Sequence, residues 1–143
     1  MEGTETMAKK IRIGFIGCGG IATGHYQRLH ATKKAQVVAL NEPNPDKLER
    51  FRTHAEGSAD LPVYADYKDM LKNEQLDGVV ILSPHTVHFE QASTALRKGL
   101  HVLAEKPMVC TINHAKALIQ TARKAKRVPV SYTHLTLPTK RIV

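Results

Sequence analysis

Short apolar runs alternate along the chain with segments whose apolar residues recur at helical spacing. The runs are typical of strands and cover residues 11–16, 36–41, 61–64, 78–82, 100–104 and a last one that begins at Val128. The run Val37–Leu40 is apolar without alternation, which is typical of a strand buried on both faces. Strands that alternate with helices of about ten residues need crossover connections, so the pattern predicts an α/β fold with a parallel sheet covered on both faces.

Capping residues predict where several of the intervening helices begin and end. Asp46, Asp66 and Thr111 each precede a helical pattern and are predicted N-caps. The first helix is predicted over residues 20–34 and the fourth over residues 86–98, where Gly99 ends it.

A glycine turn links the first strand to the first helix. In the segment Gly17–Ala22, Gly17 permits a tight turn, Gly19 lets the backbone approach a diphosphate, and Ala22 is small enough for close helix packing. Glu42 follows the second strand, twenty positions after Ala22, where a carboxylate can accept hydrogen bonds from an adenosine ribose. The spacing predicts a dinucleotide-binding chain that uses NAD. A flavin, S-adenosylmethionine or a merely sharp corner are the alternatives for the glycines taken alone.

This combination predicts a Rossmann doubly wound parallel sheet with strand order 3-2-1-4-5-6. The ligand is expected to cross the switch point between the first and fourth strands, at the carboxyl edge of the sheet.

Composition is that of one ordinary globular domain. The chain has 143 residues, of which 42% are hydrophobic and 24% charged, and no apolar stretch approaches the length of a membrane span. Cys18 and Cys110 have no paired-ligand spacing, so neither a disulfide framework nor a zinc site is expected. We therefore expect a cytoplasmic protein that does not act at a membrane.

The net charge of +8 comes from basic residues scattered in short groups. Nucleic-acid binding favours one basic face interleaved with aromatic residues, and no aromatic residue lies among these groups. The charge indicates a solvated basic surface, and no nucleic-acid partner is expected.

Two further motifs follow the fourth and fifth strands: residues 83–88, Ser-Pro-His-Thr-Val-His, and residues 105–107, Glu-Lys-Pro. With the glycine turn, they make the chain resemble the glucose-fructose oxidoreductase, inositol dehydrogenase and MocA family from about Lys10 to Val130. The resemblance implies an NAD(P)-dependent oxidoreductase, a dehydrogenase that acts on CH–OH groups of sugars, cyclitols or polyols.

The resemblance also implies the site residues. The cofactor-binding residues would be Gly17, Gly19, Gly20, Ile21, Glu42, Ser83, Pro84, His88, Glu105 and Lys106. Lys106 would also be catalytic, by stabilising negative charge that develops on the substrate oxygen. His85 stands where the family commonly has asparagine, which puts a contact from that position in doubt.

Other polar residues receive structural interpretations. His85 and His88 have the spacing of a metal pair but lack a third ligand, so no metal is expected. Five further histidines are interpreted as surface or rim residues: His25, His30, His54, His101 and His114. Cys18 is interpreted as structural filler, although a helix N-terminus can lower the pKa of a thiol.

The expected domain organisation is a disordered lead over residues 1–9, the nucleotide-binding domain over 10–130, and a tail over 131–143 that does not match the family. We interpret this tail as appended linker or adapter sequence, with a divergent natural tail as the alternative. Family members carry a second, substrate-binding domain, which is expected to be absent here. The chain would then be half an enzyme that binds cofactor without turnover, and the full-length protein a homo-oligomer.

Three functions are weighed. The first is the cofactor half of a sugar or polyol oxidoreductase, and the second is a non-catalytic NAD(P)-binding sensor or regulatory domain. The third is a methyltransferase-type domain that binds S-adenosylmethionine, against which the motifs at 83–88 and 105–107 count. NAD is expected rather than NADP, because the Glu42 carboxylate repels the 2′-phosphate.

Overall fold

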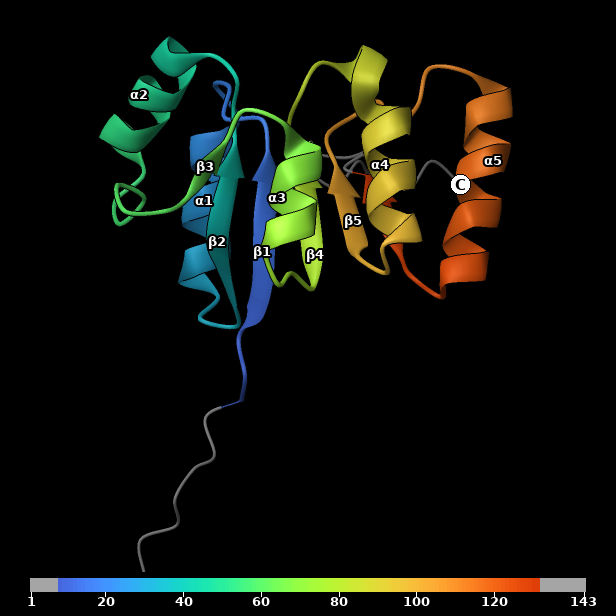
Figure 1. Ribbon diagram of the computed structural model, residues 1–143, viewed down its shortest axis with the longest axis horizontal. Coiled ribbons are helices and arrows are strands. Elements are labelled where there is room, and N and C mark those ends of the chain that lie inside the picture. The colour runs from blue at the N-terminus through green and yellow to red at the C-terminus, as the bar shows by residue number, and fades with distance from the viewer. Residues whose placement is uncertain (1–7, 132–143) are drawn as a thin grey trace, which may run out of the picture.

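A six-stranded parallel sheet forms the centre of the protein, as seen in a computed structural model that describes residues 8–131. Its strand order, β3-β2-β1-β4-β5-β6, confirms the predicted order 3-2-1-4-5-6, and the fold is of Rossmann type (Figure 1). The strands are β1 (Ile11–Ile16), β2 (Ala35–Asn41), β3 (Val63–Tyr64), β4 (Gly78–Ile81), β5 (His101–Ala104) and β6 (Pro129–Ser131). Residues 1–7 of the expected lead and 132–143 of the expected tail lie outside the described residues.

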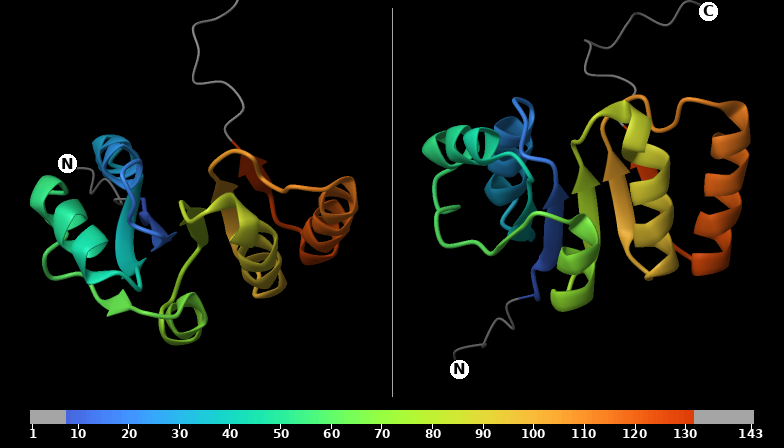
Figure 2. Two further views of the ribbon diagram at one scale, coloured as in Figure 1. Left: turned by 90° about the horizontal axis from the view of Figure 1, so that it is seen from above. Right: turned by 45° about the horizontal axis from the view of Figure 1, so that its top comes forward.

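Helices cover both faces of the sheet. They are α1 (Ala22–Ala31), α2 (Pro45–His54), α3 (Tyr67–Asn73), α4 (His88–Arg97) and α5 (Ile112–Ala125), with a 3₁₀ turn η1 (His85–Val87) before α4. Seen from above, α1 and α2 lie on one face, and α3, α4 and α5 lie on the other (Figure 2).

Each face of the sheet buries its own apolar core, because successive strand residues point to opposite sides. On the α1 and α2 face, Phe15 packs with its ring centroid 6.3 Å from those of Tyr26 and Phe51. On the other face, Ile81 and Leu96 are fully buried among residues of α3, α4 and α5. The sheet edge that carries the site is therefore held from both sides.

Two of the three predicted N-caps are confirmed. The Asp66 side chain accepts the Lys68 N–H at 2.8 Å, and Thr111 Oγ1 accepts the His114 N–H at 3.1 Å. The prediction for Asp46 is wrong: Asn44 caps α2, with Oδ1 2.9 Å from the Asp46 nitrogen. Pro45 explains the shift, since its fixed φ and missing N–H suit the first helical position and start the helix earlier.

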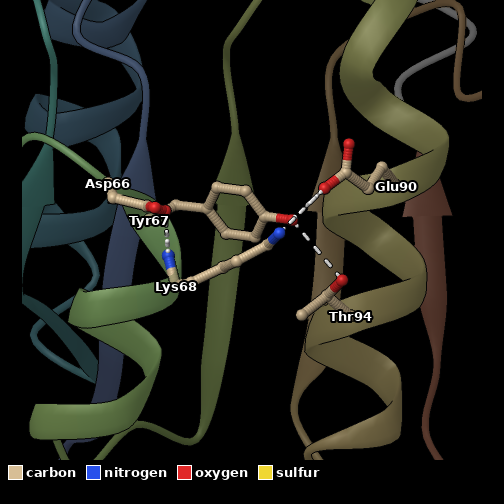
Figure 3. Close-up of polar contacts among 5 residues, drawn as sticks. All are labelled: Asp66, Tyr67, Lys68, Glu90 and Thr94. Atoms are coloured by element: carbon tan, nitrogen blue, oxygen red, sulfur yellow. Dashed lines mark hydrogen bonds and ion pairs between the residues drawn. The ribbon is translucent and has the colours of Figure 1, made fainter.

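Polar contacts join α3 to α4 and shape one wall of the site (Figure 3). The Tyr67 hydroxyl lies 3.1 Å from Glu90 Oε1 and 3.4 Å from Thr94 Oγ1. Lys68 Nζ lies 3.4 Å from the same Glu90 oxygen, but both of these side chains are more than half exposed. The ion pair therefore adds little stability, and its effect is to fix the Tyr67 ring.

The turn after β1 approaches the end of β4 closely. Gly17 has φ +93°, and a Cβ built there would lie 2.9 Å from the Leu82 carbonyl carbon and 2.9 Å from the Ser83 nitrogen. Both atoms are backbone, so no side-chain rotation could relieve the contact. Glycine is required here, as the sequence predicts.

We predict that Gly17→Ala destabilises the fold by about 2–4 kcal/mol, because it combines left-handed strain with a backbone clash. Gly20→Ala is the matched control, since a Cβ at position 20 meets no atom within 4 Å. Urea unfolding followed by circular dichroism measures both variants. Equal stability of the two would contradict the close approach.

Candidate functional site

The β1–α1 turn is held by backbone hydrogen bonds from two neighbouring strands. The Gly17 N–H donates to the Asn41 carbonyl at 2.8 Å, and the Leu82 N–H donates to the Ile16 carbonyl at 2.7 Å. These bonds fix the end of β1 between β2 and β4. The turn therefore opens onto the switch point of the sheet, where α/β folds bind ligands.

Gly19 and Gly20 leave the start of α1 uncovered. A Cβ at either position would meet no heavy atom within 4 Å. Their amides donate no hydrogen bond to any residue of the range 8–131. Ala22, by contrast, is fully buried against the sheet, which confirms that close packing at this position excludes a large side chain. Free amides at the start of a helix attract anions.

Glu42 is more deeply engaged than the sequence indicates. Only 9% of the residue is exposed, and its Oε1 and Oε2 accept the N–H groups of Cys18 and Asn44, each at 3.0 Å. The carboxylate thus ties the glycine turn to the start of α2. Each oxygen keeps a further lone pair for a ligand hydroxyl.

A cleft of about 520 Å³ lies at this edge of the sheet. Its walls come from the segments that follow β1, β2, β3 and β4. Five predicted site residues line it: Gly17, Gly19, Glu42, Ser83 and Pro84. The sequence analysis did not single out Asn44, Tyr67, Thr86 and Gln91, which also line it.

Ser83 and His88 connect the turns after β4 and β5. The Ser83 hydroxyl donates a short hydrogen bond to Gln91 Oε1. The His88 ring is 1% exposed, with Nδ1 2.8 Å from the Pro107 carbonyl oxygen and Nε2 2.7 Å from the Ser83 carbonyl oxygen. His88 therefore contacts the backbone of both turns.

Glu105 and Lys106 differ in their surroundings. Glu105 follows β5 and is mostly buried, with Oε2 3.2 Å from His25 Nε2. Lys106 is exposed at the same sheet edge, and a cis peptide bond joins it to Pro107. Neither residue lines the cleft described above.

The interpretation of His25 as a surface or rim residue is wrong. His25 is 4% exposed, inside α1, and pairs with Glu105 across the sheet edge. Its place on the same helical side as Ala22 was the available signal. The partner lies 80 positions along the chain, and sequence spacing does not reveal so distant a contact.

The remaining predicted residues lie at the periphery. Ile21, 40% exposed, is the N-cap residue of α1, and Gly20 lines a neighbouring cleft between α1 and α2. His85 is exposed in η1. Among residues 8–131, no group of three His, Cys, Asp or Glu side chains is placed to hold a metal ion.

Comparison with known proteins identifies the site. Residues 11–134 match the oxidoreductase family with an NAD-binding Rossmann fold, that of glucose-fructose oxidoreductase, inositol dehydrogenase and MocA. The chain belongs to this family. It is similar to glucose-6-phosphate 3-dehydrogenase of Bacillus subtilis (32% identity, covering 79% of this chain and 31% of the relative). It is also similar to inositol 2-dehydrogenase of Burkholderia multivorans (31% identity, covering 77% and 32%).

Solved structures of family members have the same fold. The WlbA dehydrogenase of Bordetella pertussis, in complex with NADH and UDP-GlcNAcA, superposes with a TM-score of 0.77 at 27% identity, covering 87% of this chain and 37% of that one. A 3-ketoreductase of Actinomadura kijaniata, in complex with TDP-benzene and NADP, gives 0.75 at 32% identity, covering 86% and 38%. This chain thus spans about a third of the length of its relatives.

Family membership makes the chain an oxidoreductase-family domain with an NAD-binding fold, and it removes the ground for the methyltransferase alternative. Within the part of the chain that the structure describes, no helix is long and apolar enough to cross a membrane.

Cys18 is an inert neighbour of the turn. Burial, followed by the nearby Glu42 carboxylate, raises the pKa of its thiol to about 12, and Arg52 only partly opposes this. The interpretation as structural filler is therefore favoured over a reactive thiolate.

We predict that a thiol reagent at about pH 8 labels Cys110, which is exposed, and leaves Cys18 unmodified in the folded chain. Because the raised pKa favours the folded state only while the thiol keeps its proton, this contribution is full below pH 9.0 and is lost as the pH rises toward 12. Mass spectrometry of labelled peptides, with Cys110→Ser as the control, measures the site. Rapid labelling of Cys18 in folded protein would contradict the burial.

Proposed function

We propose that the chain is the nucleotide-binding part of an NAD(P)-dependent oxidoreductase that transfers a hydride between nicotinamide and a sugar, cyclitol or polyol. The uncovered position at Gly19 carries the proposal. A backbone with free amides and open space for a missing side chain is suited to a diphosphate. Ordinary surface turns do not need a glycine whose neighbouring space stays empty.

The residues present fit the cofactor. Gly17 forms the turn, and Gly19, Gly20 and Ile21 would place amides against the diphosphate. Glu42 would accept a ribose hydroxyl with a lone pair that the backbone does not use. Ser83 and Pro84 would line the opposite wall of the cleft. Nicotinamide supplies the hydride acceptor or donor when it is bound.

Lys106, with Glu105, would act at the reacting end. The exposed ammonium at the carboxyl edge of the sheet can stabilise negative charge on a substrate oxygen. His25 holds Glu105, and His88 holds the carbonyl of Pro107, so both sides of Lys106 are anchored. We therefore propose Lys106 as catalytic and His88 as a residue that positions it.

The names of the relatives support the substrate class. Glucose-6-phosphate 3-dehydrogenase and inositol 2-dehydrogenase are named for oxidation of sugar or cyclitol hydroxyls. Because this chain spans a third of their length, we propose that it binds cofactor without turnover and that the full-length protein is a homo-oligomer. A non-catalytic sensor is the second candidate, favoured only by the capacity of this domain to bind nucleotide alone.

Gly19→Ala tests the proposal. The added methyl group would enter space that no protein atom occupies, so folding should be unchanged while NADH binding weakens at least about tenfold. Gly24→Ala, also near the start of the first helix but away from the cleft, is the control. Calorimetric titration with NADH measures both. Unchanged affinity of Gly19→Ala, or no binding by the unmodified chain, would overturn the proposed function.

Glu42→Gln tests the ribose contact. Removing the charge should weaken NADH binding about three- to tenfold and raise the affinity for NADPH relative to NADH, because the repulsion of a 2′-phosphate is lost. The thermal unfolding midpoint serves as a check, since Glu42 also accepts two backbone N–H groups. A relative affinity that does not change in folded variant protein would contradict this role.

A further inference from the structure

A second cleft, of about 610 Å³, lies between α1 and α2, behind the glycine turn. Lys47, Arg50 and His54 of α2 line it, facing Thr23 and Gln27 of α1. Within the described part of the chain, its lining includes no Asp or Glu. The cleft is therefore polar and electropositive.

The basic side chains form one stripe on α2. Positions 47, 50 and 54 have the i, i+3, i+7 spacing that brings residues to one face of a helix, whereas Glu49 points away. Within residues 8–131, neither Lys47 nor Arg50 forms an ion pair with a carboxylate. Their charges are thus available to an anion that enters the cleft.

His54 is oriented by a local contact. Its Nδ1 lies 2.9 Å from the Arg50 carbonyl oxygen, and a carbonyl can only accept, so Nδ1 donates. The other ring nitrogen, Nε2, is then the one left for a ligand, and it becomes a donor when the ring is protonated.

The two clefts meet at the glycine turn, since Gly19 and Lys47 line both. In the proposed function, the adenosine ribose contacts Glu42, which lies between the turn and the start of α2. A phosphate carried on that ribose would lie nearest to the basic stripe.

We propose that Lys47, Arg50 and His54 form a phosphate subsite that accepts the 2′-phosphate of NADP(H). This inference rests on the proposed function and changes the cofactor preference expected from the sequence. Glu42 opposes a 2′-phosphate, but its two oxygens already accept backbone N–H groups, and three basic side chains act in the other direction. The chain should therefore bind NADPH with an affinity within about tenfold of that for NADH.

The test is a calorimetric titration of the 143-residue chain with NADH and with NADPH. Arg50→Gln combined with His54→Gln should weaken NADPH binding about five- to twentyfold and change NADH binding less than about twofold. Arg123→Gln, an exposed arginine on α5, is the matched control and should change neither. Raising the salt concentration should weaken NADPH binding more than NADH binding.

The outcomes separate the two proposals. If neither cofactor binds the unmodified chain, the proposed function fails, and the subsite fails with it. If NADH binds and the double variant leaves NADPH binding unchanged, or weakens both cofactors equally, only the subsite is overturned. Inorganic phosphate is titrated as a third probe, and phosphate that binds as tightly as the 2′-phosphate contributes would indicate a free-phosphate site instead.

Discussion

The close contact between the β1–α1 turn and the end of β4 is the constraint on which the site depends. Gly17 can make this contact only because it lacks a side chain, and the adjoining backbone lies where a Cβ would be. The contact directs the next residues outward, so the amides of Gly19 and Gly20 open onto the sheet edge. It also brings Cys18 within hydrogen-bond distance of Glu42, and so joins three loops into one rigid wall.

The hydrophobic pattern predicted the fold well because strand and helix periodicity are local properties. The strand order, the caps at Asp66 and Thr111, and the strained glycine at position 17 are all confirmed. The start of α2 was missed because Asn44 and Asp46 are both good caps, and Pro45 decided between them. Two good candidates so close together cannot be separated by residue preference alone.

Contacts between distant segments were beyond sequence reasoning. The His25–Glu105 pair joins the first helix to the fifth strand, and the His88 ring joins the turns after the fourth and fifth strands. Both pairs anchor residues that the family motifs had identified, but neither follows from spacing. The basic stripe of α2 is different: its periodicity is visible in the sequence, and only the cleft beside it gives the stripe a meaning.

The central claim is that the free amides at the start of α1 bind a pyrophosphate, and backbone-resolved NMR tests it most directly. On addition of NADH to the ¹⁵N-labelled chain, the account predicts that the amide resonances of Gly19, Gly20 and Ile21 shift most. The α5 amides on the far side of the sheet should shift least. NADH-induced shifts that spare these three amides, or no shifts at millimolar NADH, would contradict the account.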